Sequence, residues 1–484
     1  MTDCNIPNRS IFCHDNLDVL RGINSECIDL IYLDPPFNKN KKFTAPIGSS
    51  AEGASFKDIF REEDVKDEWL ITIQEDEPEL YHYLNGIRGV GNPYNFAYLA
   101  YMAIRLIECE RALKKNGAIY LHCDPTMASH LKLMMDAIFS EQNFRTQISW
   151  KRTTSSQKGS QHKSKKWGNN TDVILFYAKS NQTRLNPFRE LTEEESIVKF
   201  NRIDEQGNRY YDDSAHIWRT PGMGARPNLC YEWRGFTNPH PSGWRLEKDR
   251  LEEEYQKGNI VILSNGRLQR RKYKKDYPGY TFGNFWDDIN PAQGEEYKGY
   301  PTQKSLALMY RIIEASSNEG DMILDPFCGC ATTCVAAEHL NRQWIGIDIS
   351  IIAYDLVRER LTDQAADPGH ILQFRNRINL KTDPPKRTDQ DIDYRERKFV
   401  YIISHPSYPG EYKVGIAKNA QSRLVAYQTA DPERAYKIEY KMETPYFREL
   451  EKHIHDRFQN KHEWVQADLK DIKQEMINYK PIQT

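Results

Sequence analysis

The tetrapeptide Asp34-Pro35-Pro36-Phe37 holds the residue types best suited to chemistry in this chain. It follows the apolar run 28–33, which is typical of a buried strand. Its carboxylate can accept hydrogen bonds, its prolines fix a turn that lacks backbone N–H groups, and its aromatic ring can stack on a flat ligand. These groups suit a site that holds the amino group of a planar heteroaromatic ring. The alternative is a Pro-Pro strand terminator with an incidental aspartate.

A second candidate site follows almost 300 residues later, in the segment ILDPFCGCATT (323–333). The segment reads as a strand, a tight glycine turn and the start of a helix. Such a turn lets the backbone approach a ligand closely. Asp348 ends the next predicted strand, where Rossmann-like sheets place a carboxylate for ribose hydroxyls. There is no GxGxxG pattern, so the segment by itself also fits an ordinary strand-to-helix turn.

Together the two segments and the sequence PTQKSLAL (301–308) resemble the amino-methyltransferases of DNA, which use S-adenosylmethionine. The order here is the Pro-Pro motif, a variable region, PTQK and then DPFCG. That order matches the circular permutation of the family's β class. The resemblance covers about residues 1–360, and the combination of motifs is specific.

The resemblance implies a cofactor-binding role for seven residues. Asp325, Phe327 and Gly329 are expected on the methionine and adenosine side of S-adenosylmethionine, and Asp348 at its ribose. Thr302, Gln303 and Lys304 are expected beside the methionine moiety. The chain departs from many relatives at Cys330, where they have glycine.

The resemblance also implies how the Pro-Pro motif acts on double-stranded DNA. Asp34 and the carbonyl of Pro35 are expected to accept the two N–H bonds of an exocyclic base amine, and Phe37 to stack on the base. Pro36 completes the turn. Because this amine is inaccessible inside a duplex, the base must flip out. Aspartate at the first position favours adenine N6 over cytosine N4, and both remain open. Asp15 is expected to cap the first helix, and an approach to the base is the alternative.

Three rivals stay open beside this interpretation. One is a solitary methyltransferase whose C-terminal part only binds DNA. Another is a non-catalytic DNA-binding protein on a degenerate methyltransferase fold, although Asp34 and Gly329 argue against it. The third is methylation of RNA or of a protein glutamine, where related families more often have asparagine at the first position of the tetrapeptide.

Strands and helices alternate around these motifs, which predicts an α/β fold with a Rossmann-like sheet. We expect residues 44–80 to form an acidic, irregular insertion, and Asn116-Gly117 to cap a helix that starts at Tyr94. The strands are predicted at 28–33, 118–124, 172–179, 322–327 and 343–350. The helices are predicted at 94–115, 127–139, 301–317 and 332–341.

Changes in composition predict five parts of the chain. They are a catalytic half (1–180), a Trp-rich target-recognition insertion (181–285), a cofactor-binding half (286–361), a polar linker (362–397) and a small α/β module (398–484).

The net charge of -2 does not by itself indicate a nucleic-acid partner, so the distribution of charge matters. Two basic runs can neutralise DNA phosphates, and each can also be an ordinary solvated face. The second run is RLQRRKYKK (267–275). The first lies between Glu141 and Asp172 and contains Arg145, Lys151, Arg152, Lys158, Lys163, Lys165 and Lys166, with Trp150 and Trp167 between them.

The C-terminal module resembles the GIY-YIG nuclease superfamily in its phage-associated branch. The segments FVYIIS (399–404) and EYKVGIAKN (411–419) read as two hairpin strands, and HEW (462–464) matches the terminal motif of the branch. The resemblance implies a phosphate-binding set of Tyr401, Tyr412 and Arg423, with Glu451 as the ligand of Mg²⁺. The first glycine is replaced by Val400, and the second tyrosine comes one place early. Cleavage and mere DNA docking therefore both stay open.

The bulk composition sets the remaining expectations. Nine scattered cysteines without a framework spacing indicate reduced thiols. The sequence shows no basic-then-apolar leader and no apolar run of membrane-spanning length, so we expect a cytoplasmic protein without a membrane partner. A homodimer is left open.

Overall fold

The computed structural model describes residues 3–90, 92–153, 169–183, 185–213, 217–238, 240–362, 377–389, 398–417, 420–444, 446–461 and 464–479. Within these ranges the chain divides into a large unit (1–186 with 284–484) and a smaller one (187–283), which are described separately.

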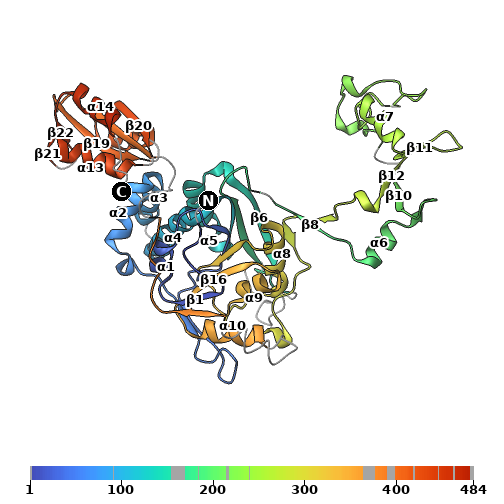
Figure 1. Ribbon diagram of the computed structural model, residues 1–484, viewed down its shortest axis with the longest axis horizontal. Helices are drawn as coiled ribbons and strands as arrows, with labels where there is room; N and C mark the ends of the chain where they lie inside the picture. Colours follow the sequence, from blue (N-terminus) through green and yellow to red (C-terminus); the bar gives the residue numbers. More distant parts are fainter. Residues whose placement is uncertain are drawn as a thin grey trace. The chain divides into compact units, whose positions relative to one another are not determined.

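A mixed sheet of nine described strands forms the centre of the large unit (Figure 1). From β5 to β17 all neighbouring strands are parallel, whereas β7 runs antiparallel to both β5 and β6. In spatial order the strands are β14 (Phe285–Trp286), β6 (Phe144–Lys151), β7 (Thr171–Ala178), β5 (Leu113–Cys123), β2 (Ile28–Leu33), β15 (Met322–Asp325), β16 (Gln343–Asp348), β1 (Ser10–Cys13) and β17 (Asn379–Lys381).

Helices cover both faces of this sheet, because the side chains of each strand alternate between two apolar cores. In β2, Ile31 and Leu33 belong to one core, and Leu30 and Tyr32 to the other. The first core holds α1 (Asn16–Gly22), α2 (Asp67–Asp76), α3 (Pro78–Gly89), α4 (Pro93–Ala112) and α5 (Pro125–Phe139), and the second holds α8 (Leu306–Ser316), α9 (Thr332–His339) and α10 (Ile352–Thr362). The fold is therefore a three-layer α/β arrangement.

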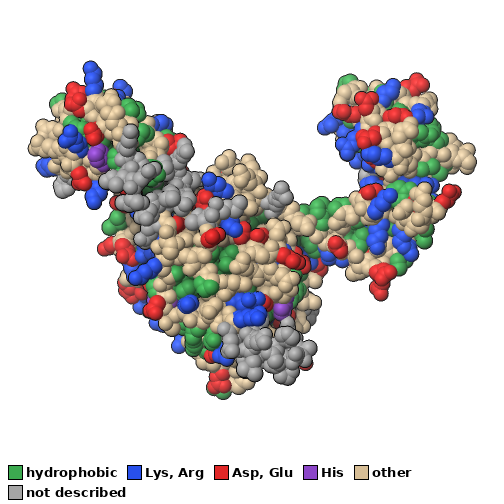
Figure 2. All heavy atoms as spheres, viewed as in Figure 1, with side chains coloured by type: hydrophobic (Ala, Val, Ile, Leu, Met, Phe, Trp, Pro, Cys, Tyr) green, Lys and Arg blue, Asp and Glu red, His purple; other side chains and the backbone are tan. Residues whose placement is uncertain are grey.

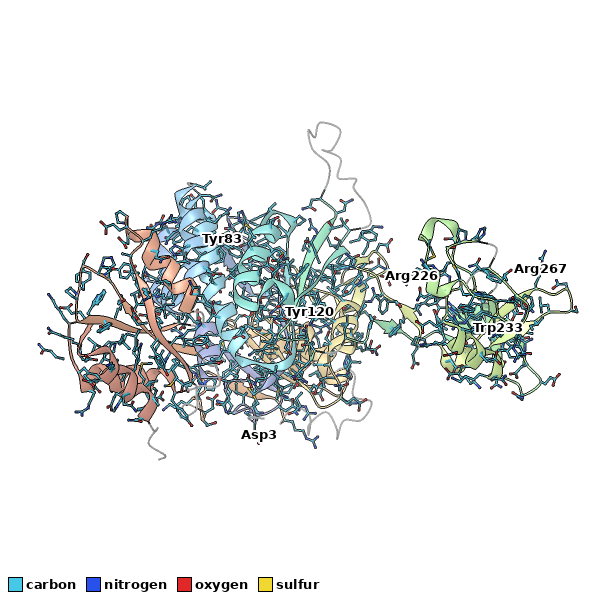
Figure 3. The ribbon with its side chains drawn as sticks, turned by 90° about the horizontal axis from the view of Figure 1, so that it is seen from above. Asp3, Tyr83, Tyr120, Arg226, Trp233 and Arg267 are labelled. Carbon is cyan, nitrogen blue, oxygen red and sulfur yellow. The ribbon has the colours of Figure 1, made fainter. Side chains whose placement is uncertain are left out.

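Unit 187–283 has its own small core, which surrounds Trp233 and Trp244. Figure 3 shows Trp233 inside this unit and Arg267 at its edge. Its elements are β8 (Phe188–Arg189), α6 (Glu193–Lys199), β9 (Arg202–Ile203), β10 (Arg209–Asp213), α7 (Lys248–Gln256), β11 (Ile260–Ile262), β12 (Leu268–Tyr273) and β13 (Tyr280–Thr281).

The C-terminal module has a separate five-stranded sheet in its described residues, with the order β20-β18-β19-β22-β21. Its elements are β18 (Lys398–Ser404), β19 (Glu411–Ala417), α12 (Ala420–Ala430), β20 (Lys437–Thr444), α13 (Phe447–Arg457), β21 (Gln459–Lys461), β22 (Trp464–Gln466) and α14 (Leu469–Asn478). Short 3-10 helices elsewhere are η1 (Glu62–Asp64), η2 (Glu141–Asn143), η5 (Pro221–Met223), η6 (Pro227–Leu229), η7 (Lys274–Asp276) and η8 (Gly294–Glu296).

Three sequence predictions about these elements were wrong. Helix α4 ends at Ala112 rather than at Asn116-Gly117, because residues 113–117 join strand β5. Residues 44–80 are not irregular, since they complete a hairpin of β3 (Lys41–Thr44) with β4 (Ser55–Asp58) and then form helices. Helix α8 starts at Leu306, so PTQK precedes it as a loop.

The expected linker 362–397 is not a free connector where it is described. Strand β17 within it pairs with β1, and the carboxylate of Asp389 accepts a hydrogen bond from the backbone N–H of Ser25. Part of this segment therefore belongs to the large unit. In the described ranges, no helix combines the length and the apolarity that crossing a membrane would require.

Candidate active site

The two sequence motifs meet because β2 and β15 are neighbours in the sheet. Leu30 pairs with Ile323, and Ile31 with Leu324, in parallel register. The carboxyl ends of parallel strands lie at the same edge, which is where open α/β sheets bind ligands. Asp34 follows β2, and Asp325 and Asp348 end β15 and β16. The pairing thus places three carboxylates along one edge.

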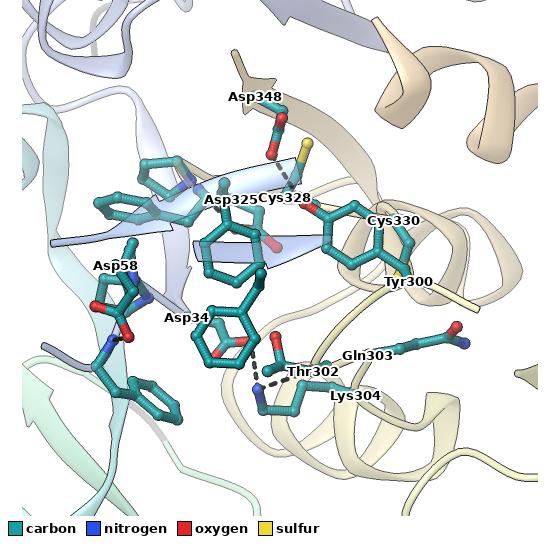
Figure 4. Close-up of a pocket in the computed structure, with 18 of the residues that line it drawn as sticks. Asp34, Asp58, Tyr300, Thr302, Gln303, Lys304, Asp325, Cys328, Cys330 and Asp348 are labelled. Atoms are coloured by element: carbon teal, nitrogen blue, oxygen red, sulfur yellow. Dashed lines mark hydrogen bonds and ion pairs between the residues drawn. The ribbon is translucent and has the colours of Figure 1, made fainter. Parts of the chain in front are cut away.

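A cavity of about 1110 Å³ opens at this edge. It lies within the large unit, and part of its wall is drawn in Figure 4. Every residue predicted for the Pro-Pro site and for the cofactor lines it, namely Asp34, Pro35, Pro36, Phe37, Thr302, Gln303, Lys304, Asp325, Phe327, Gly329 and Asp348.

Of the two carboxylate oxygens of Asp34, one has a partner in the protein and the other has none among the described residues. Its Oδ2 forms an ion pair with the Nζ of Lys304, which also donates to the carbonyl of Thr302 at 3.2 Å (Figure 4). Its Oδ1 is buried and has no hydrogen-bond partner among the described residues. The ring centroid of Phe37 lies 5.4 Å from Lys304 Nζ and 5.9 Å from the His122 ring. The carboxylate is therefore oriented by the lysine, with one acceptor left for a ligand.

The chain after the Pro-Pro turn is fixed by Asp58, which the sequence did not indicate. The Asp58 carboxylate accepts the backbone N–H groups of Phe37 at 3.2 Å, Asn38 at 2.6 Å and Lys39 at 3.0 Å. Burial raises the pKa of this carboxyl above its ordinary value. Asp58 lies in β4, so the hairpin of β3 and β4 positions the aromatic ring at the cavity.

The glycine turn is held by the two carboxylates beside it. Phe327 N donates to Asp325 at 3.0 Å, and Gly329 N donates to Asp348 at 3.0 Å. Gly329 has φ of 53°, and a Cβ there would lie 2.9 Å from the ring of Tyr300. Burial raises the pKa of Asp325 to about 7 and that of Asp348 to about 6. The turn thus presents backbone and two protonatable carboxyls to the cavity.

A buried histidine beside the Pro-Pro site was missed. His122, on β5, contacts the hydroxyl of Tyr32 through Nδ1 at 2.8 Å and Asp172 through Nε2 at 3.3 Å. Burial and the nearby Lys304 lower the pKa of His122 below its ordinary value. A histidine near the end of the strand next to β2 was the available signal. Its ring stacks against the ring of Phe37, which lines the cavity.

Asp15 behaves as predicted and caps α1, accepting from the backbone N–H of Leu17 at 2.8 Å. It also receives the guanidinium of Arg105 at 3.1 Å. Arg105 donates to Asn16 at 2.6 Å, and Asn16 in turn donates to the carbonyl of Pro326 at 2.9 Å. This chain of contacts braces the start of the glycine turn.

Three cationic side chains of the second basic run form ion pairs within the protein. In the second basic run, Arg270 pairs with Glu254, Arg271 with Asp212 and Lys272 with Asp213. Figure 2 shows basic and acidic side chains interspersed over the face it draws.

The first basic run is described only at its ends. Arg152 pairs with the buried Asp172 at 3.1 Å, and Arg145 donates to the carbonyl of Ser180 at 2.9 Å. Trp150 and Lys151 lie at the end of β6 within the described residues. The other members lie outside the described residues, namely Lys158, Lys163, Lys165, Lys166 and Trp167.

In the C-terminal module the structure brings together only part of the predicted set. Arg423 Nε lies 3.4 Å from the hydroxyl of Tyr401, which lies 3.1 Å from the hydroxyl of Tyr427. Lys413 Nζ lies 4.6 Å from the Tyr427 ring. Both Lys413 and Tyr427 were missed as members of this cluster.

Tyr412 does not join this cluster, so its predicted place was wrong. Neighbouring residues of a strand point to opposite faces. Tyr401 packs with the core under α12, whereas Tyr412 packs with the core under α13 and α14. Lys413 therefore occupies the side of β19 on which the second tyrosine was expected.

Glu451 lies on α13, whose Leu450 and Ile454 pack into the same core as Tyr412. In the described ranges no three His, Cys, Asp or Glu side chains are grouped closely enough to hold a metal ion. His462 and Glu463 of the terminal motif lie outside those ranges.

The fold and the cavity define an α/β protein with a ligand site at the carboxyl ends of parallel strands. Residues 28–359 match the family model of the N6_N4_Mtase DNA methylases, and residues 398–482 match the T5orf172 domain. The chain belongs to the N6_N4_Mtase family and is a DNA methyltransferase.

Curated relatives share moderate identity with this chain. A type II methyltransferase, M.EcaI of Enterobacter cloacae, is 28% identical over 425 residues, which cover 87% of this chain and 82% of that protein. The Mod subunit of the type III restriction-modification enzyme StyLTI of Salmonella typhimurium is 28% identical over 68% of this chain and 49% of its own length. The DNA adenine methyltransferase YhdJ of Escherichia coli is 23% identical over 71% of this chain and 79% of its own length.

Among solved structures, the M1.HpyAVI-SAM complex is 15% identical with a TM-score of 0.35, covering 73% of this chain and 98% of that chain. The cytosine-N4-specific PvuII DNA methyltransferase is 11% identical with a TM-score of 0.40, covering 78% of this chain and 99% of that chain.

Proposed function

We propose that the chain transfers a methyl group from S-adenosylmethionine to the N6 amine of an adenine flipped out of duplex DNA. The vacant, buried Oδ1 of Asp34 carries this proposal, because a buried acceptor without a partner is costly unless a ligand satisfies it. An amine is the donor that fits a carboxylate beside an aromatic ring.

The residues around the glycine turn fit the cofactor. The turn leaves no room for a side chain at Gly329, as expected where a backbone approaches a ligand closely. Asp325 suits the positive charge of the methionine moiety, and Asp348 suits the hydroxyls of the ribose. When bound, S-adenosylmethionine supplies an electrophilic methyl group on a sulfonium.

The Pro-Pro site would activate the amine by geometry. Its lone pair is conjugated into the base ring, which makes it a poor nucleophile. Asp34 Oδ1 and the Pro35 carbonyl accept the two N–H bonds and draw the nitrogen toward a tetrahedral shape, while Phe37 fixes the ring. The freed lone pair would accept the methyl group from the bound cofactor, which would leave as a neutral thioether, and the nitrogen would then lose one proton to solvent.

Adenine N6 is preferred to cytosine N4 because the tetrapeptide starts with aspartate, and because one relative is named a DNA adenine methyltransferase. Another relative is named as a subunit of a restriction-modification enzyme, and we propose the same setting here. Unit 187–283 is proposed to select the target sequence.

A labelling experiment tests this function. Purified protein, duplex DNA and methyl-labelled S-adenosylmethionine should yield label in N6-methyladenine after digestion to nucleosides. Label in N4-methylcytosine would show that the target base is cytosine and not adenine. An absence of label in DNA at every salt concentration would reject the proposal.

Cofactor binding should depend on pH through Asp325 and Asp348. Because their pKa values are raised, Asp348 becomes ionised only as the pH rises to about 6, and Asp325 only as it rises to about 7. Because a cationic ligand prefers the ionised forms, the affinity for S-adenosylmethionine should rise by roughly tenfold per pH unit between about 6 and about 7, where Asp325 titrates. The rise should be steeper below about 6, where both carboxyls titrate, and the affinity should level off above about 7. Calorimetric titration across this range measures it, and Asp325→Asn should bind weakly with a flatter profile.

The same raised pKa values fix the sign of a stability effect. The native state binds more protons than the unfolded state between the ordinary and the raised pKa of each carboxyl. These two groups therefore lower the free energy of unfolding of the ligand-free protein as the pH rises from about 4 to about 7. An Asp325→Asn variant that kept the full wild-type pH dependence of both binding and stability would refute the assignment.

For the C-terminal module we propose binding of the DNA backbone by Tyr401, Arg423 and Lys413. The observation in its favour is that two cations meet at the ring of Tyr427, namely Lys413 from β19 and Arg423 from α12, and that Arg423 also contacts the hydroxyl of Tyr401. Such groups suit a phosphate. Mg²⁺-dependent cleavage with Glu451 as metal ligand is the alternative.

Plasmid DNA distinguishes the two functions of this module. We expect Arg423→Ala to weaken DNA binding, and we expect supercoiled plasmid to stay intact with Mg²⁺. Nicking that requires Mg²⁺ and disappears in Glu451→Ala would establish the nuclease instead. Nicking that survives this substitution would remove Glu451 from the site.

A further inference from the structure

Three lysines of the β3–β4 hairpin, Lys41, Lys42 and Lys57, form a basic rim on the cavity. All three are exposed. In the described part of the chain, none of the three has an acidic side chain within ion-pair distance. Their charge is therefore available to a ligand, unlike that of Arg270, Arg271 and Lys272.

The hairpin register places like charges opposite each other. Lys42 pairs with Lys57 across the two antiparallel strands. Like charges directly opposite in such a pair destabilise it. Lys41 faces Asp58, whose oxygens already accept three backbone N–H groups. The hairpin thus carries an uncompensated positive charge that an anion between Lys42 and Lys57 would relieve.

The rest of the hairpin is anchored, so this charge is held at the cavity. The rings of Phe43 and Phe56 stack at 5.1 Å, and Phe56 stacks on Tyr300 at 6.5 Å. Ala51 in the connecting loop is fully buried and donates its N–H to the carbonyl of Lys298 at 3.1 Å. Tyr300 in turn lies against Gly329. The basic rim is therefore tied to both halves of the site.

We propose that the basic rim binds the DNA phosphates that flank the flipped base. This inference rests on the proposed function and extends it to the contact with the DNA backbone. The cofactor cannot be the ligand of the rim, because S-adenosylmethionine has no phosphate and carries a net positive charge near pH 7. A polyanion that must deliver one base into the cavity is the ligand with complementary charge.

The salt dependence of DNA binding tests this proposal. For the Lys42→Gln/Lys57→Gln variant, the affinity for a short fluorescent duplex should fall on the order of tenfold or more at low salt. The slope of log K against log salt should decrease by about 2, since each lost phosphate contact removes about 0.9. The affinity for S-adenosylmethionine should stay unchanged. Lys115→Gln, an exposed lysine early in β5, is the matched control and should change none of these values.

A second variant separates binding from folding. Lys57→Glu places a favourable pair opposite Lys42, so its thermal midpoint should equal or exceed that of the wild type while DNA affinity falls. Wild-type affinity and salt slope in the double glutamine variant would overturn the proposal. Wild-type affinity and salt slope in Lys57→Glu would overturn it as well. Binding is measured without methyl transfer, so a failure of the rim and a failure of the methyltransferase function give different results.

Discussion

Asp34→Ala should leave S-adenosylmethionine binding intact while methyl transfer falls by about 10²–10³-fold or more. The carboxylate supplies the acceptor whose Oδ1 is vacant, and losing one such transition-state contact has an effect of this order. The measurement is single-turnover labelling of duplex DNA, with cofactor affinity determined by calorimetry. Methylation at the wild-type rate would exclude Asp34 from the chemistry.

The ion pair with Lys304 requires a control for this experiment, because removing one partner leaves a buried charge, which is strongly destabilising. Asp34→Asn keeps the shape and removes the charge. Combining it with Lys304→Met removes both charges and should recover the thermal stability without recovering activity. Recovered activity in the double variant would mean that the aspartate only compensates the lysine.

Gly329→Ala should weaken S-adenosylmethionine binding by roughly tenfold or more. The new Cβ would lie 2.9 Å from the Tyr300 ring, in a turn whose φ of 53° already disfavours a side chain. The clash should displace the turn. A tenfold loss of affinity corresponds to about 1.4 kcal/mol of binding free energy. Calorimetric titration of the purified variant measures the effect.

Two further variants separate steric contact from backbone strain. Gly266→Ala introduces a side chain at φ of 75° with no atom within 4 Å, and should not affect cofactor affinity. Adding Tyr300→Ala to Gly329→Ala should recover part of the affinity, because the ring no longer meets the methyl group. If the double variant bound as weakly as Gly329→Ala, the contact with Tyr300 would not be the cause.

The Pro-Pro and glycine motifs could be predicted from the sequence because each lies within a short segment with a local conformational cause. Proline and glycine determine the two turns, and the apolar runs before them predict strands. Asp58 could not be predicted, since its role depends on a hairpin that returns it to residues 37–39. His122 belongs to a strand that was predicted, but only the sheet order reveals its contact with Phe37.

The error at Tyr412 has a simple physical origin. A strand exposes successive residues on opposite faces, so a motif displaced by one position places its side chain on the other side of the sheet. The sequence showed the displacement between Tyr412 and Lys413, and the structure shows its consequence. The ion pairs within the basic run 267–275 could not be predicted for another reason, because the acidic partners of Arg270 and Arg271 are distant in sequence or lie on a neighbouring strand.

The pairing of β2 with β15 has a consequence for folding during synthesis on the ribosome. At roughly 5–20 residues per second, about 15–60 s separate the synthesis of these two strands. During that interval β2 lacks its neighbour on one side, and no methylating site exists on the nascent polypeptide. The module that starts with β18 emerges later still. Any action of that module on DNA therefore begins only after the segments that build the methylating site have been made.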